Sequence, residues 1–225
     1  MGLAAATLPF PTGFGWAPEP KLSLAQWSLH RALFDGSLKA WDFPRITSEQ
    51  FGIRAVEYVN QFYKDHRDQP GYWQDFKAMT DNLGVQNLLI MVDDEGQLGA
   101  PASDARRQAV ENHLRWAGVA AQLGCHSIRV NAFGTGDRES LRGALVDGLG
   151  MLSEKAGDLG VGVLIENHGY HTSDGAYITS IIHEVGHPGL GTLPDFGNWC
   201  LNKEWGSTMG GTCEANYGPE KAPRR

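Results

Sequence analysis

The chain has 225 residues, of which 41% are hydrophobic, enough for one sizeable core, and we expect one domain. The formal net charge is -7, so the chain lacks the clustered Lys and Arg with which proteins bind nucleic acids or anionic membranes. The three cysteines lie far apart without a C-x-x-C pair, which indicates neither a disulfide framework nor a zinc ribbon. We therefore expect a small-molecule partner, with no nucleic acid and no membrane.

Residues 1–20 differ in composition from the rest of the chain. An apolar, Ala-rich run at 3–8 is followed by Pro and Gly, without a preceding basic region, and it is too short to span a bilayer. Two interpretations stay open, a simple tail or the remnant of an export signal that starts upstream. The chain is accordingly expected to be either cytoplasmic or exported.

From residue 21 onward, short apolar runs alternate with longer segments of helical period. The clearest helix runs from Ser103, a candidate N-cap, to Gly124, a candidate C-cap, and residues 139–160 repeat its pattern. Strands and helices that alternate about every thirty residues predict βαβ units and a parallel sheet covered by helices. The predicted strands are 22–29, 55–59, 87–92, 127–130, 162–165 and 190–193.

Polar residues follow nearly every predicted strand. The first strand is not followed by G-x-G-x-x-G, which disfavours a nucleotide-binding open sheet. In a TIM barrel the carboxyl ends of all strands meet at one mouth, although polar residues at these positions are also ordinary turn formers. Their succession favours a barrel with a site at its mouth, formed by His30, Asn60, Asp93, Glu95, Asn131, Glu166, His168 and Asp195.

Six segments occur in a characteristic order, namely LSLAQWSLHRALFDG, GIRAVEYVNQF, IMVDDEG, IRVNAFG, IENHG and GTLPDFGNW. Together they resemble the sugar phosphate isomerase/epimerase family, whose fold is a xylose isomerase-like TIM barrel. The resemblance implies an α/β fold of the TIM (β/α)8 type, of which residues 21–199 hold only about six of eight βα units. Residues 200–225, rich in Gly, are expected to form a truncated loop after the sixth strand.

The resemblance also assigns a divalent metal site to the mouth, with Glu166 and Asp195 as ligands and Mn, Mg, Co or Zn as the ion. Two strand-end carboxylates need a compensating charge when they are buried, and a hard cation supplies it. Glu166 is in addition the expected catalytic acid/base, which moves a proton next to a substrate carbonyl. The alternative for Glu166 is a structural salt bridge inside the barrel. The expected substrate-binding residues are His168, Asn131, His30 and Asn60.

The implied function is a metal-dependent isomerase or epimerase of a sugar or sugar phosphate, acting through an ene-diolate. Because two units are missing, we consider a fragment, a homo-oligomer that completes the sheet, and an inactive member of the family. Two other functions stay open, a non-catalytic sugar-binding or interaction protein and an endonuclease IV-like phosphodiesterase. The last is disfavoured, because few histidines fall at strand ends and an acidic surface repels DNA.

Residues 183–187, HEVGH, match the zinc-protease motif His-Glu-x-x-His, which needs both histidines on one unbroken helix. Pro188 disfavours the helical conformation for His187. Leu190 and Leu193 also stand where the metzincin extension requires Gly and His. We therefore predict that this segment is the end of a helix and not a protease site.

Overall fold

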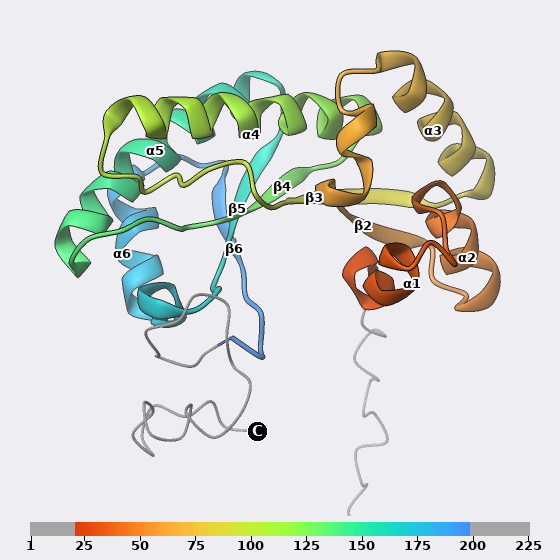
Figure 1. Ribbon diagram of the computed structural model, residues 1–225, viewed down its shortest axis with the longest axis horizontal. Coiled ribbons are helices and arrows are strands. Elements are labelled where there is room, and N and C mark those ends of the chain that lie inside the picture. The colour runs from red at the N-terminus through yellow and green to blue at the C-terminus, as the bar shows by residue number, and fades with distance from the viewer. Residues whose placement is uncertain (1–20, 199–225) are drawn as a thin grey trace, which may run out of the picture.

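A computed structural model describes residues 21–198 (Figure 1), so the predicted tail at 1–20 and the predicted loop at 200–225 lie outside the described residues. Six parallel strands form one sheet in which spatial order follows chain order. The strands are β1 (Leu24–Ala25), β2 (Ala55–Val59), β3 (Gln86–Val92), β4 (Ser127–Asn131), β5 (Gly162–Glu166) and β6 (Leu190–Leu193). Parallel strands in this order, with helices after each strand from β1 to β5, form a partial TIM barrel, as the sequence predicted.

The α-helices are α1 (His30–Phe34), α2 (Phe43–Gln50), α3 (Pro70–Leu83), α4 (Ser103–Leu123), α5 (Arg138–Asp158) and α6 (Gly175–Val185). The short 3-10 helices are η1 (Gln26–Leu29), η2 (Ala40–Asp42), η3 (Asn60–His66) and η4 (Tyr170–Ser173). Consecutive helices from α3 to α6 pack against one another along one side of the sheet (Figure 1). None of the helices within residues 21–198 has the length and apolar character needed to cross a membrane.

The two faces of the sheet carry different side chains, because successive residues of a strand point to opposite faces. On the outer face, residues such as Ile128, Val130 and Val163 pack against the helices in the main core. On the inner face a much smaller apolar cluster forms around Val59, Leu89 and Met91. The inner face therefore has room for polar residues, and the candidate site lies there.

The first strand is much shorter than the predicted range 22–29, which is wrong beyond Ala25. The buried side chain of Gln26 takes over the pairing with β2, since its Oε1 accepts a hydrogen bond of 2.9 Å from the backbone N of Val59. Its Nε2 donates to Tyr63 Oη at 2.9 Å. The backbone can then leave the sheet and turn into η1.

The predicted C-cap of α4 is confirmed, and its predicted N-cap is wrong by one residue. Gly124 is the C-cap, with a left-handed φ of 73°, as predicted. Ser103 is the first residue of α4 and not the N-cap, a position held by Ala102 without a capping side chain. The helix predicted at 139–160 is α5, where Asp137 is the N-cap and accepts hydrogen bonds from the backbone N of Glu139 and Ser140.

The HEVGH segment does not form one helix. α6 ends at Val185, and Gly186 follows in the left-handed conformation with φ of 63°. His187 lies beyond the helix and its Nδ1 accepts a hydrogen bond of 3.0 Å from the backbone N of Gly189. Glu184 forms an ion pair with Arg142 of α5. The zinc-protease geometry is therefore absent from this segment.

Candidate active site at the barrel mouth

An open cavity of about 1150 Å³ lies on the inner face of the sheet, over the carboxyl ends of the strands. Four residues that were predicted from the sequence to be metal ligands or to bind substrate line this cavity: Asn131, Glu166, His168 and Asp195. Asp93, which follows β3, lines it as well. A TIM barrel places its active site at this end.

Glu166 is the last residue of β5, and its side chain contacts Arg129 and Asn198. Only 6% of the residue is exposed. Its Oε2 lies 2.8 Å from Nε of Arg129. Its Oε1 accepts a hydrogen bond of 3.2 Å from Nδ2 of Asn198. The ion pair inside the barrel, the alternative for Glu166, is thus present, while the second oxygen contacts Asn198, which also lines the cavity.

Arg129 lies in the middle of β4 and connects two acids. Its Nη1 donates a hydrogen bond of 2.7 Å to Oδ1 of Asp93, which also accepts one of 2.6 Å from Nδ2 of Asn131. The residue is 5% exposed. One buried guanidinium therefore partly neutralises Asp93 and Glu166, which would otherwise repel each other.

The pKa of the Glu166 carboxyl is raised above its usual value. Burial is the largest cause, because it disfavours the charged form. Arg129 and His168 act in the opposite direction, and the negative charges of Asp195 and Asp93 raise the pKa further. A carboxylate with a raised pKa is a stronger base than an ordinary carboxylate, which suits a group that accepts a proton.

Asp195 follows β6 and is fixed by the side chain of Asn167. The Oδ1 of Asn167 accepts a hydrogen bond of 2.7 Å from the backbone N of Asp195, and its Nδ2 donates one of 2.9 Å to the backbone O. The carboxylate of Asp195 accepts from Nδ2 of Asn198 at 3.0 Å. Glu166 and Asp195 therefore direct one oxygen each to the same amide nitrogen of Asn198.

This pair of carboxylates fits the oxygen ligands of a hard divalent cation. The two oxygens converge on the side-chain nitrogen of Asn198, a donor that carries partial positive charge. Within residues 21–198 no group of three or more His, Cys, Asp or Glu side chains is arranged to hold a metal ion. The described residues thus fit part of a coordination shell.

His168 and Asn131 meet at the cavity wall. Nδ1 of His168 lies 2.6 Å from Oδ1 of Asn131. Because an amide oxygen only accepts hydrogen bonds, Nδ1 carries the hydrogen. The same Nδ1 lies 3.9 Å from Oε1 of Glu166. Both residues are within reach of a ligand beside Glu166.

His30 and Asn60, the other two expected substrate-binding residues, do not line the cavity. His30 belongs to α1 and stacks on Trp27, a cavity residue, with 4.7 Å between ring centroids. Asn60 is fully buried, and its side chain is hydrogen-bonded to the backbone N and O of Asp93, at 2.9 Å each. Asn60 thus supports the acid after β3 and is out of contact with the cavity.

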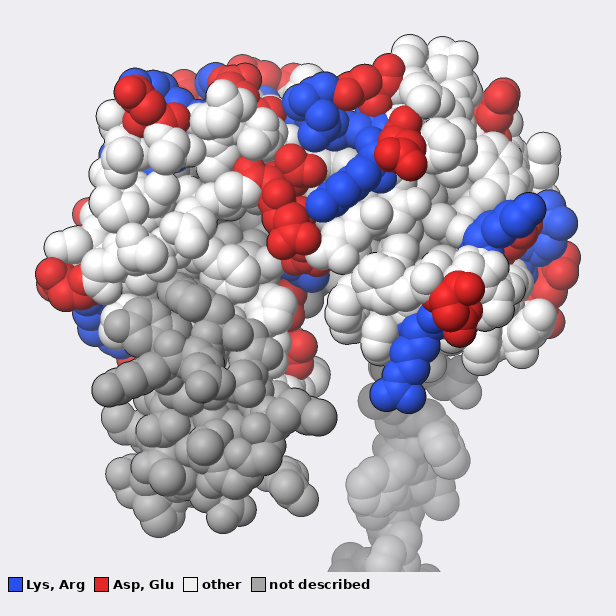
Figure 2. Space-filling view, in the orientation of Figure 1, with Lys and Arg blue, Asp and Glu red and all other residues white. Residues whose placement is uncertain are grey.

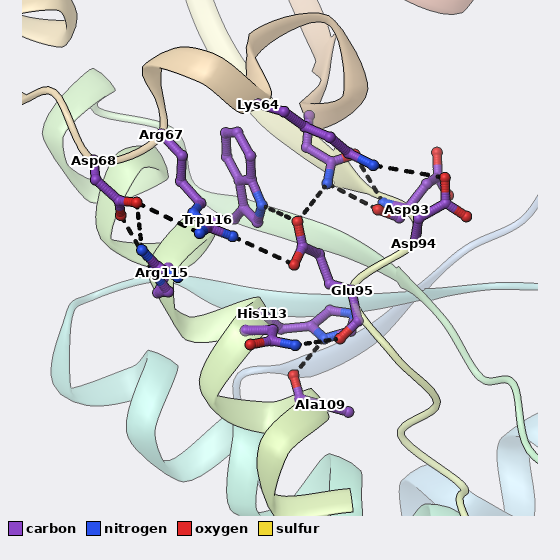
Figure 3. Close-up of polar contacts among 12 residues, drawn as sticks. Lys64, Arg67, Asp68, Asp93, Asp94, Glu95, Ala109, His113, Arg115 and Trp116 are labelled. Atoms are coloured by element: carbon purple, nitrogen blue, oxygen red, sulfur yellow. Dashed lines mark hydrogen bonds and ion pairs between the residues drawn. The ribbon is translucent and has the colours of Figure 1, made fainter. Parts of the chain in front are cut away.

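Glu95 also turns away from the mouth, toward α4 (Figure 3). Its Oε1 accepts a hydrogen bond of 2.8 Å from Nε1 of Trp116, and its Oε2 lies 3.5 Å from Nη1 of Arg67. The cause is the left-handed conformation of Asp94, with φ of 60°, which reverses the direction of the chain.

Sequence reasoning missed Arg129, Asn167 and Asn198. Arg129 had a usable signal, because it stands two residues before Asn131 in an apolar strand and so shares its face. A charged residue inside such a strand requires a partner. Asn167 and Asn198 had no comparable signal, since Asn is common in turns.

The family model described as the xylose isomerase-like TIM barrel matches residues 47–218. The chain belongs to this family. No curated protein sequence matches it significantly.

Solved structures of the xylose isomerase-like fold resemble the chain at low identity. D-psicose 3-epimerase from Clostridium cellulolyticum, with D-tagatose, has a TM-score of 0.63 and 13% identity over 74% of this chain and 61% of that one. 3-Keto-D-glucoside 4-epimerase from E. coli has a TM-score of 0.59 and 16% identity over 71% and 64%. A probable 3-DHS dehydratase from Bacillus anthracis has a TM-score of 0.63 and 19% identity over 80% and 64%.

The chain thus spans less than two thirds of the length of these three proteins. At these identities the likeness shows the xylose isomerase-like fold alone, which in these proteins supports epimerases and a probable dehydratase.

Proposed function

We propose that this chain carries the site of a metal-dependent sugar isomerase or epimerase that moves a proton next to a substrate carbonyl. The observation that carries the proposal is the pairing of Glu166 and Asp195, two carboxylates at neighbouring strand ends that face one amide nitrogen. The family and the two epimerases of similar fold support it.

Glu166 and Asp195 would supply oxygen ligands to Mn, Mg, Co or Zn. When bound, such a cation polarises a substrate carbonyl and stabilises the negative charge of an ene-diolate. The chain's own contribution is to hold the two acids in place, through Arg129 on Glu166 and Asn167 on Asp195.

Glu166 would act as the acid/base. It accepts the proton from the carbon next to the carbonyl, and the burial that raises its pKa makes it a stronger proton acceptor. His168 and Asn131, which line the cavity, would bind substrate hydroxyls. Glu166 can return the proton only from the face from which it took it, so transfer to the neighbouring carbon gives an isomer, whereas an epimer requires a second acid on the other face of the ene-diolate.

The test is proton exchange at the reacting carbon. The purified 225-residue chain is incubated with D-fructose and Mn²⁺ in D₂O, and NMR follows deuterium incorporation beside the carbonyl. We expect exchange above the rate of Mn²⁺ alone, and a loss of about 100-fold or more in Glu166→Gln. Glu111→Gln, the same change on the exposed side of α4, should retain the exchange. Equal exchange in the wild type and Glu166→Gln would contradict the proposed role.

A second candidate is a non-catalytic sugar-binding protein, favoured by the ion pair that already engages Glu166. It predicts sugar binding that survives Glu166→Gln and no deuterium incorporation in either protein. The same experiment therefore separates the two candidates when binding is measured alongside exchange.

A further inference from the structure

We infer that the cavity selects an uncharged polyhydroxy substrate and rejects its phosphorylated counterpart. The inference rests on the proposed function and narrows its substrate class, which sequence left open between sugar and sugar phosphate. It is carried by the charge of the side chains that line the cavity within residues 21–198 and by the carboxylate oxygens that they present.

The lining of the cavity is strongly acidic. It contains one guanidinium, Arg129, and five carboxylates, Glu57, Asp93, Asp94, Glu166 and Asp195. In Figure 2 acidic side chains lie at the centre of the visible face, close to the end of β3 and beside Lys and Arg side chains. A bound divalent cation would not reverse the sign of this charge, so a phosphate dianion would enter a negative field.

The cations near the cavity are already paired. Arg129 is buried, and its Nη1 and Nε lie 2.7 and 2.8 Å from the carboxylates of Asp93 and Glu166. At the rim, Lys64 lies 3.8 Å from Asp94 and is not part of the lining. Within residues 21–198 no unpaired Lys or Arg lines the cavity to bind a phosphate.

Helix N-termini are the other common phosphate sites, and in this fold they lie at the mouth. The N-terminus of α5 is occupied by Asp137, whose Oδ1 accepts from the backbone N of Ser140 at 2.9 Å. The N-terminus of α6 is occupied by Asp174, which accepts from the backbone N of Ala176 at 3.0 Å. At α5 and α6 a carboxylate thus uses donors that a phosphate would need. The N-terminus of α4 has no capping side chain, but neither Ala102 nor Ser103 lines the cavity.

Carboxylates with a free oxygen instead suit hydroxyl groups, which donate hydrogen bonds to them. In Asp93, both donors bind Oδ1, and in Asp94 the hydrogen bond from Gln61 goes to Oδ2. Glu57 likewise accepts from Ser23 through Oε1. Each of the three retains a second oxygen without a hydrogen-bond partner inside residues 21–198, a pattern that matches a ligand with several hydroxyls.

The test compares D-fructose with D-fructose 6-phosphate, which carries a phosphate on O6 of the same sugar. Dissociation constants are measured by calorimetry on the full 225-residue chain at saturating Mn²⁺ and low salt. We expect D-fructose 6-phosphate to bind about tenfold or more weakly than D-fructose. The ratio of the two dissociation constants should fall as salt is added. The double variant Glu57→Gln/Asp94→Asn should reduce the ratio by strengthening phosphate binding.

Asp94→Asn is a mild change, because Asn tolerates the left-handed conformation at this position. The matched control is Asp81→Asn/Glu111→Gln, which removes the same charge from the outer helices and should leave the ratio unchanged. Binding of the phosphate as tightly as the free sugar would overturn the inference and leave the proposed function standing. Binding of neither sugar would overturn the proposed function together with the inference.

Discussion

At the scale of single residues, Arg129 determines the electrostatics of the inner face. It is 5% exposed and contacts Asp93 and Glu166, so its removal leaves two acids close together in a poorly solvated place. We expect Arg129→Met to lower the free energy of unfolding by about 3–5 kcal/mol, measured by urea denaturation at pH 7. Arg129→Lys should lose less, because it keeps the charge. A Met variant as stable as the wild type would contradict this role.

A second residue-scale prediction concerns His113 of α4, which is 2% exposed and contacts the backbone O of Ala109 through Nδ1 at 2.7 Å. Burial lowers the pKa of its imidazole below the usual 6.5. The unfolded chain then binds a proton more readily, so the stabilisation is present above pH 6.5 and is lost as the pH falls below it. Urea midpoints between pH 7.5 and pH 5 should fall more steeply in the wild type than in His113→Gln. Parallel curves would refute the assignment.

At the scale of elements, one device occurs twice. Asn60 follows β2 and binds the backbone of Asp93 after β3, and Asn167 follows β5 and binds the backbone of Asp195 after β6. Each side-chain amide bonds to a backbone N and O, as a neighbouring strand would. Each therefore fixes the position of an acid at the mouth. In both cases the acid that follows one strand is held by the asparagine that follows the preceding strand.

The two amides therefore form a matched pair of variants. Asn167→Ala removes two hydrogen bonds and Asn60→Ala removes three, one of them a long bond of 3.4 Å to Glu95 Oε1, and each change should cost about 1–3 kcal/mol of stability. We expect only Asn167→Ala to weaken Mn²⁺ binding, measured by calorimetry, since Asp195 is a proposed ligand and Asp93 is not. Equal weakening by both would show that the effect is a general loss of structure.

Strands two to six could be predicted from sequence because each is a short apolar run with a clear polar end. β1 could not, because the buried side chain of Gln26, and not the backbone, continues the pairing beyond Ala25. The meeting of strand ends at a barrel mouth predicted that Glu166, His168 and Asn131 lie near one another, and the structure brings them together. It could not reveal that Asp94 takes a left-handed conformation and sends Glu95 to Trp116.

At the scale of the whole molecule, the chain is a xylose isomerase-like TIM barrel in which helices cover one side of the sheet and the acids gather on the other. Solved structures of this fold include two epimerases and a probable dehydratase, so the fold alone does not fix the reaction. The chemistry depends on whether Glu166 and Asp195 act together on a bound cation.

The most direct test of that claim is calorimetry of Mn²⁺ binding to the 225-residue chain, beside Glu166→Gln, Asp195→Asn and the control Glu111→Gln. The account predicts about one ion per chain in the wild type and the control, with binding abolished by either of the other changes. Mn²⁺ binding that survives both Glu166→Gln and Asp195→Asn would place the metal elsewhere and contradict the proposed site. Absence of binding in a wild-type chain that is folded would contradict it equally.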